Sequence, residues 1–150
     1  MLQRIQTVYL LIASICMVVS LLTHLATFSF NGEIVQFEAI GFYLNQEVIF
    51  STWGLFIIGN LSAILSVGTV FLYNKRMLQI RLSAINIFMI VGYYGLIALY
   101  IFMRNPEIDS SFQNIGIGMI TPFIAIILTY LAIRKIGTDE ALVRSLDRIR

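Results

Sequence analysis

One short basic segment lies between two long uncharged stretches near the middle of this chain. The segment Asn74–Arg81 is rich in Lys and Arg, whereas residues 48–74 and 82–103 carry no charge. A helix rises about 1.5 Å per residue, so about 20 apolar residues cross the hydrocarbon core of a bilayer. Both uncharged stretches are long enough. The segment is therefore predicted to be the turn of a transmembrane helical hairpin.

Most of the chain shares this apolar character. Hydrophobic residues make up 59% and charged residues 12% of the sequence, against about 45–50% and about 25% in soluble domains. The apolar residues occur in uncharged runs without helical or alternating spacing. We therefore expect an all-α membrane protein, a four-helix bundle that forms a single integral membrane domain. The predicted helices span about residues 7–28, 53–73, 81–103 and 112–133.

The distribution of charge predicts the orientation of these helices. Short loops rich in Lys and Arg stay on the cytoplasmic side of a membrane. This rule places both termini and the central turn in the cytoplasm, with Arg104 as the exception outside. The basic residues on the predicted inner side are Arg4, Lys75, Arg76, Arg81, Arg134, Lys135, Arg144, Arg148 and Arg150.

The predicted outer loop, residues 29–52, has the signals of a small β-structure. Asn31-Gly32 is a strong hairpin signal, because a type I′ turn needs positive φ at both central positions. Asn45-Gln46 is a candidate for a second turn. We expect a β-hairpin-like loop of two or three short strands over the outer mouth of the bundle, with an irregular or partly helical loop as the alternative.

Small residues mark the second predicted helix as one that packs closely. Gly59/Ala63 and Ser62/Ser66 are spaced one turn apart, which lets helix backbones approach each other in a membrane. Packing within the chain is the expected use, and dimerisation is the alternative. Asn60 is expected to form a structural hydrogen bond to another helix.

Pro122 lies inside the fourth predicted helix and is expected to kink it. A proline there frees the carbonyl four residues earlier, which belongs to Gly118. Broken helices form binding sites in some transporters, but a simple bend is the more common result.

The C-terminal residues have the pattern of a separate helix. Gly137 is expected to end the membrane part, and Thr138 can cap a new helix. We expect a cytoplasmic amphipathic helix over residues 138–150 that lies on the anionic inner leaflet or docks on a neighbour.

The sequence lacks the residue patterns of common membrane enzymes and transporters. No acidic or basic residue falls inside the predicted spans, where pumps and proton-coupled transporters carry them. The chain has a single cysteine, Cys16, and a single histidine, His24. No cofactor, metal site or nucleic-acid partner is expected. The alternative is a site at the outer mouth, where His24, Glu33 and Glu38 would converge.

The predicted cytoplasmic face is the expected docking surface. Basic residues are interleaved there with neutral hydrogen-bonding ones, and the tail helix is expected to pack on the turn Asn74–Arg81. The face would bind anionic headgroups and a membrane or cytoplasmic protein. The residues expected to bind a partner or lipid are Arg4, Lys75, Arg76, Gln79, Arg81, Arg144 and Arg148.

Three segments of the chain resemble a known family of small membrane proteins. They are the opening Met1–Leu10, the segment Leu78–Leu82 and the tail Asp139–Arg148. Together they resemble the domain-of-unknown-function family 4293, four-helix inner-membrane proteins of Bacteroidota. The resemblance covers essentially the whole chain and implies a multi-pass protein of a bacterial inner membrane, without an activity to transfer.

These observations favour a non-enzymatic role. We expect a subunit, scaffold or assembly factor of a larger membrane complex. The alternative is a small membrane enzyme or transporter with its site at the outer mouth of the bundle.

Overall fold

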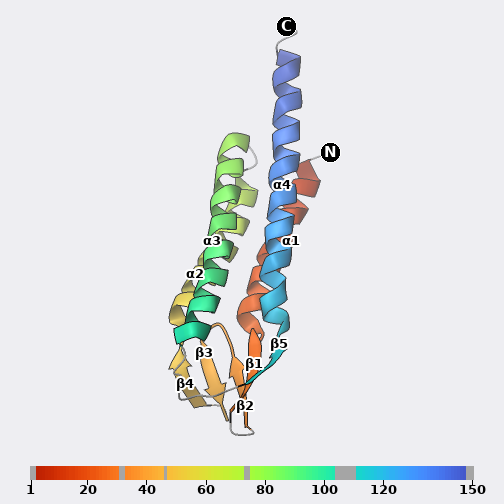
Figure 1. The fold of residues 1–150 in the computed structure, drawn as a ribbon. Coiled ribbons are helices and arrows are strands. Elements are labelled where there is room, and N and C mark those ends of the chain that lie inside the picture. The colour runs from red at the N-terminus through yellow and green to blue at the C-terminus, as the bar shows by residue number, and fades with distance from the viewer. Residues whose placement is uncertain (1–2, 31–32, 46, 73–74, 104–110, 148–150) are drawn as a thin grey trace.

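Four helices run side by side, and a small β-sheet closes one end of them (Figure 1). The computed structural model describes residues 3–30, 33–45, 47–72, 75–103 and 111–147. We call the end with the strands the sheet end, and the end with both termini and the α2–α3 connection the turn end. The helices are α1 (Gln3–Leu22), α2 (Trp53–Phe71), α3 (Arg76–Met103) and α4 (Ile117–Asp147).

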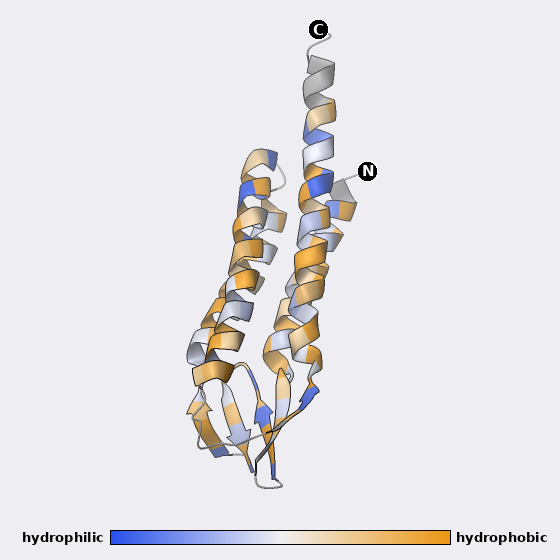
Figure 2. Ribbon diagram, viewed as in Figure 1, coloured by the Kyte–Doolittle hydropathy of each residue, from blue (hydrophilic) through white to orange (hydrophobic). Residues whose placement is uncertain are grey.

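The helices form a ring in which each packs against two neighbours. α1 contacts α2 and α4, and α3 contacts the same two helices from the other side. All four are long and apolar enough to cross a bilayer, which indicates a membrane protein. Figure 2 shows apolar residues along the helices and hydrophilic residues in the sheet, around the α2–α3 connection and towards the end of α4.

The sheet is antiparallel and has five strands in the order β4-β3-β2-β1-β5. Its central strand is β2, which pairs with β1 and β3, and the last strand comes from the loop before α4. β5 pairs with β1 through Ala26 and Ile115, far apart in the sequence. The strands are β1 (Ala26–Phe30), β2 (Glu33–Phe37), β3 (Gly41–Leu44), β4 (Glu47–Ser51) and β5 (Ser111–Ile115).

The expectation of an all-α fold with a hairpin-like loop is therefore wrong. The predicted strands after Asn31-Gly32 do form, but they are part of a larger sheet to which both loops of this end contribute. Alternating burial explains why: on β2, Val35 and Phe37 are buried while Ile34 and Gln36 are exposed. A sheet with one apolar face packs that face on the helix ends.

Two short connections set the register of the strands. Phe30 pairs with Glu33 across the first, so the predicted hairpin is confirmed, although Asn31 and Gly32 themselves lie outside the described residues. Leu44 pairs with Glu47 across the second. There Asn45 has φ 48°, which is the left-handed conformation that a tight two-residue turn requires.

Because of the sheet, α1 and α4 are shorter at the sheet end than the sequence predicts. α1 ends at Leu22 and not at Phe28, because Ala26 onwards pairs with β2 and β5. α4 begins at Ile117 and not at Phe112, because residues 111–115 form β5. At the other end of the bundle, α3 starts at Arg76 and not at Arg81, so part of the predicted basic turn is helical.

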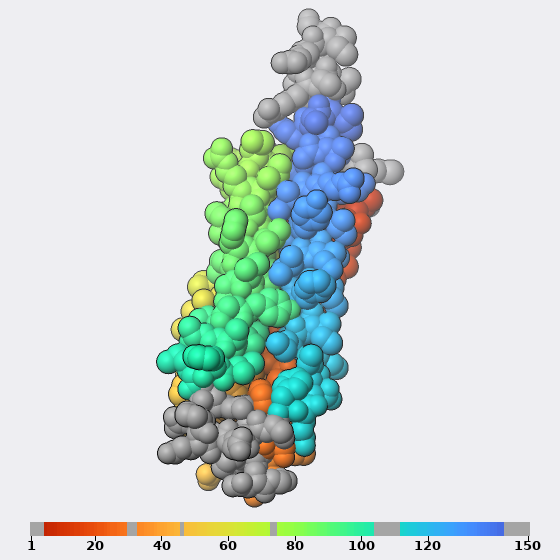
Figure 3. All heavy atoms as spheres, viewed as in Figure 1, coloured from red at the N-terminus to blue at the C-terminus, as the bar shows by residue number. Residues whose placement is uncertain are grey.

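Up to Asp147, where the described part of the chain ends, the tail does not form a separate helix. α4 continues through Gly137 to Asp147 and, at the turn end, extends beyond the start of α3 (Figures 1 and 3). Thr138 does not cap a new helix, because its hydroxyl donates a hydrogen bond of 2.6 Å to the carbonyl of Arg134 in the preceding turn. A glycine inside a helix costs only about 1 kcal/mol relative to alanine, and the residues after Gly137 favour helix. The described tail therefore does not fold back on the α2–α3 turn.

The main core lies where the sheet meets the helices. Phe37 and Phe42 stack with ring centroids 4.2 Å apart and fill the apolar face of the sheet. Leu25, just after α1, Leu55 of α2 and Tyr93 of α3 belong to the same cluster. A smaller cluster, with Met17 and Ile90, lies further along the bundle and is made mostly of small residues.

Candidate functional site

The inward face of α3 changes character along its length. Towards the sheet end its buried residues are large and mostly apolar, and towards the turn end they are polar. Each set recurs at helical spacing, so both lie on one face that points into the ring. The buried residues in order are Gln79, Ser83, Asn86, Ile90, Tyr93 and Ile97.

Asn86 joins α3 to α2 through two buried hydrogen bonds. The hydroxyl of Ser62 donates to its carbonyl oxygen at 2.8 Å, and its amide nitrogen donates to the hydroxyl oxygen of Ser66 at 2.7 Å. We call these three residues the Asn86 cluster. Its members are at most 1% exposed. The small residues of α2 therefore pack within the chain, as expected.

Two other polar residues of this region differ from expectation. Asn60 donates its amide hydrogen bond to the carbonyl of Phe56, one turn earlier in its own helix, and so does not bond another helix through it. Ser83, one turn before Asn86, is fully buried, and its hydroxyl has no hydrogen-bond partner within the part of the chain that the structure describes.

The carbonyl that Pro122 frees has a new partner. The hydroxyl of Ser20 on α1 donates to the carbonyl oxygen of Gly118 at 2.6 Å. The hydroxyl of Tyr93 lies 3.1 Å from the same Ser20 oxygen, and it is the donor there because the Ser20 proton is already used. Pro122 thus creates a structural bond between α1, α3 and α4.

Two glycines let β5 and α4 approach the end of α1 closely. A Cβ added to Gly116 would lie 2.0 Å from the carbonyl oxygen of His24, and one added to Gly118 would lie 2.8 Å from the hydroxyl of Thr23. The amides of both glycines donate to backbone carbonyls there, Gly116 to Leu25 and Gly118 to His24. His24 therefore contributes its backbone to this junction, and its side chain is exposed.

The predicted convergence of His24, Glu33 and Glu38 is not seen as one site. Glu38 lines a shallow depression of about 500 Å³ on the exposed face of β2 and β3, and Glu33 accepts a hydrogen bond from Asn45 at 3.2 Å. His24 is not among the residues that line the depression. Those residues are Ile34, Gln36, Glu38, Tyr43 and Asn45.

Strands β4 and β5 are the two edges of the sheet, and β4 is exposed along its whole length. All five of its residues are exposed, and within the described residues it pairs with β3 alone. Val48, Ile49 and Phe50 are consecutive apolar residues there, 52%, 46% and 43% exposed. An edge strand of this kind is a template for pairing with another chain. The sequence predicts a turn before these residues, but it does not indicate that they lie at an edge.

The predicted docking residues are only partly brought together at the turn end. Lys75 and Arg81 are exposed and Arg76 is half-buried, whereas Gln79 is 3% exposed and belongs to the bundle interior. The remaining predicted residues cannot be placed from the described part of the chain: these are Arg148 and the side chains of Arg4 and Arg144.

A polar contact joins α1 to α4 at the turn end. The side-chain amide of Gln6 on α1 donates to the carboxylate of Asp139 on α4. Gln6 is 6% exposed and Asp139 is half-buried. The beginning of α1 is therefore attached to α4, and Lys75 and Arg81 are exposed at the same end of the bundle.

The described side chains do not form a recognisable metal centre. Among residues 3–30, 33–45, 47–72, 75–103 and 111–147, no group of three or more His, Cys, Asp and Glu side chains lies close enough to hold a metal ion. The Asn86 cluster and Ser20 are bonded across helices, which is a structural arrangement.

Comparison with known proteins identifies the family and nothing closer. No curated protein and no solved structure matches the chain. The model of one family, described as a domain of unknown function, matches residues 2–149. The chain therefore belongs to the domain-of-unknown-function family DUF4293.

Proposed function

We propose that this protein is a non-enzymatic subunit, scaffold or assembly factor of a larger complex in the bacterial inner membrane. The observation that carries the proposal is the exposed edge strand β4, which lies at the sheet end of the bundle. A partner with an extended segment gains main-chain hydrogen bonds by adding a strand to such an edge. The side chains of Val48 to Phe50 would then supply apolar contacts.

The proposed orientation places the sheet outside the cytoplasm. Lys75, Arg76 and Arg81 lie at the turn end, and Glu33 and Glu47 lie at the sheet end. Since basic loops stay on the cytoplasmic side, β4 would meet partners that reach the outer surface of the membrane.

Cysteine labelling in intact cells tests this orientation. In a Cys16→Ser background, Asn45→Cys should react with an impermeant thiol reagent from outside, because Asn45 is an exposed turn residue. Leu78→Cys, also exposed but at the turn end, should react only after the cells are opened. Labelling of Leu78→Cys from outside would show that the orientation is the reverse of the proposed one.

Affinity purification from the native membrane tests the proposed role. We expect partner proteins in fixed ratio with the parent, and their loss from Ile49→Lys, because a charged residue on an edge strand blocks strand addition. Ile34→Lys is the matched control, since Ile34 is 57% exposed on the polar face of the sheet.

Two results would contradict the proposal. If Ile49→Lys keeps the same partners, β4 is not the docking edge. If the parent carries only a bound lipid or ion and no protein in fixed ratio, the role of a small enzyme or transporter is favoured.

A further inference from the structure

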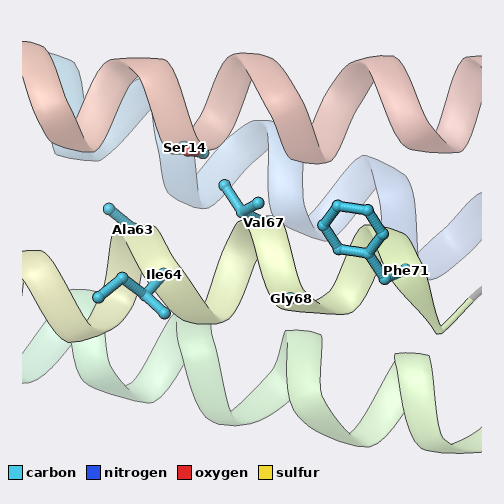
Figure 4. A pocket seen from close by; sticks show the side chains of 6 residues that line it. All are labelled: Ser14, Ala63, Ile64, Val67, Gly68 and Phe71. Atoms are coloured by element: carbon cyan, nitrogen blue, oxygen red, sulfur yellow. The ribbon is translucent and has the colours of Figure 1, made fainter.

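An apolar groove runs along the lipid-facing side of the bundle between α1 and α2. It has a volume of about 350 Å³ and is lined by Ser14 from α1 and by residues of α2 (Figure 4). Figure 4 shows Val67 and Phe71 pointing from α2 towards α1. The lining residues are Ser14, Ala63, Ile64, Val67, Gly68 and Phe71.

The groove exists because α1 and α2 are close at the sheet end and open at the turn end. A Cβ on Gly59 would lie 2.5 Å from a methyl carbon of Leu21, so the two helices touch there. A Cβ on Gly68 would find no heavy atom within 4 Å. Ile64 and Phe71, 66% and 76% exposed, form the outer walls. A groove in this position is open to lipid chains.

Basic residues come shortly after α2 in the chain, at the turn end of the bundle. Phe71 is the last residue of α2, and α3 begins at Arg76. The amide of Lys75 donates to the carbonyl of Leu72, which keeps Lys75 close to the end of α2. Lys75 is exposed and Arg76 half-buried. The lining of the groove is therefore almost entirely apolar, and two basic residues follow its last lining residue, Phe71, within five positions of the chain.

We propose that the α1–α2 groove binds an anionic phospholipid. One acyl chain lies against Ala63, Gly68 and Phe71, and the headgroup phosphate meets Lys75 and Arg76. Basic pockets between membrane helices on the cytoplasmic side bind anionic headgroups in this way. The inference depends on the membrane location of the helices and is independent of the scaffold role at β4.

The experiment uses the whole protein in nanodiscs of equal parts phosphatidylglycerol and phosphatidylcholine. The protein is then transferred to detergent, and the lipids that stay bound are identified by native mass spectrometry. We expect the parent to keep one phospholipid, with phosphatidylglycerol strongly preferred.

Two variants separate the apolar from the charged part of the site. Gly68→Leu fills the groove where there is free space, so this variant should fold normally. In detergent it should retain neither phosphatidylglycerol nor phosphatidylcholine. Lys75→Gln with Arg76→Gln should still keep a lipid, but its preference for phosphatidylglycerol should fall roughly ten- to thirtyfold.

Matched controls exclude general effects of the substitutions. Gly92→Leu places the same side chain at a glycine of α3 that also has nothing within 4 Å. Arg134→Gln with Lys135→Gln removes two exposed cations of α4. Both should behave as the parent.

Three outcomes would overturn the proposal. The first is equal lipid retention by Gly68→Leu and the parent. The second is an unchanged lipid preference after removal of Lys75 and Arg76. The third is a parent dimer that Gly68→Leu converts to a monomer without a change in bound lipid, which would make a second copy of the chain the occupant of the groove.

Discussion

The sheet-end half and the turn-end half of this bundle are stabilised by different means. At the sheet end, large side chains such as Phe37, Phe42 and Tyr93 are completely or almost completely buried in one cluster. At the turn end, α2 and α3 are joined by the hydrogen bonds of the Asn86 cluster, and the groove between α1 and α2 stays open. The same four helices therefore use two kinds of packing.

The difference follows from the solvent of each half. Burial of apolar side chains stabilises a structure only when the alternative is water. The sheet projects from the apolar helices, so the clustering of its phenylalanines is driven by the hydrophobic effect. Between helices within lipid that drive is absent, and close packing of small residues with interhelical hydrogen bonds takes its place.

The largest expected effect is on the sheet end. Phe37→Ala removes a fully buried ring that stacks on Phe42. It should lower the free energy of unfolding by about 3–5 kcal/mol, measured by denaturant titration with circular dichroism. Phe102→Ala is the control, because Phe102 is 90% exposed and should cost almost nothing. Equal effects of the two would show that the sheet has no core of its own.

A second variant tests the helix contact that separates the two halves. Gly59→Leu places a side chain where a Cβ would already lie 2.5 Å from Leu21 and 3.2 Å from Tyr93. Overpacking of this kind costs about 1–3 kcal/mol, measured as a lower midpoint of unfolding. Gly68→Leu, in the open part of the same helix, should have the same midpoint of unfolding as the parent. If Gly59→Leu also does so, α1 and α2 are not in close contact there.

The smallest effect is expected in the turn-end half. Asn86→Ala removes both hydrogen bonds of the Asn86 cluster. Interhelical hydrogen bonds in membranes are worth about 0.6 kcal/mol on average, so the pair should contribute about 1 kcal/mol to unfolding in detergent. Asn60→Ala, which loses only a bond within its own helix, should change stability less. A loss as large as that of Phe37→Ala would remove the contrast between the halves.

Much of the helical part could be predicted from uncharged length alone. The runs on both sides of the Asn74–Arg81 segment gave α2 and α3 within a few residues at most ends, because few other structures accommodate so many apolar residues. The β1–β2 hairpin was also predictable, since Asn31-Gly32 is a local signal.

The features that were missed depend on contacts between distant residues. β5 was not predicted, because residues 112–115 were interpreted as the start of the fourth helix and the pairing with β1 joins residues as distant as Ala26 and Ile115. Gln79 was expected to be exposed with the cations, but its spacing from Ser83 and Asn86 places it on the buried face. Gly137 was interpreted as a helix end because Thr138 after it can cap a new helix, and Ser20 gave no signal that it bonds Gly118.

The position of β5 in the sheet has a consequence for the order of synthesis. A ribosome makes β1 to β4 before α2, α3 and β5, so β1 at first pairs with β2 alone and its other edge stays unpaired. That edge is completed only after two further helices have been made, and unpaired edges expose a nascent chain to wrong partners. The sheet is therefore completed by β5, which is made after α3 and just before α4.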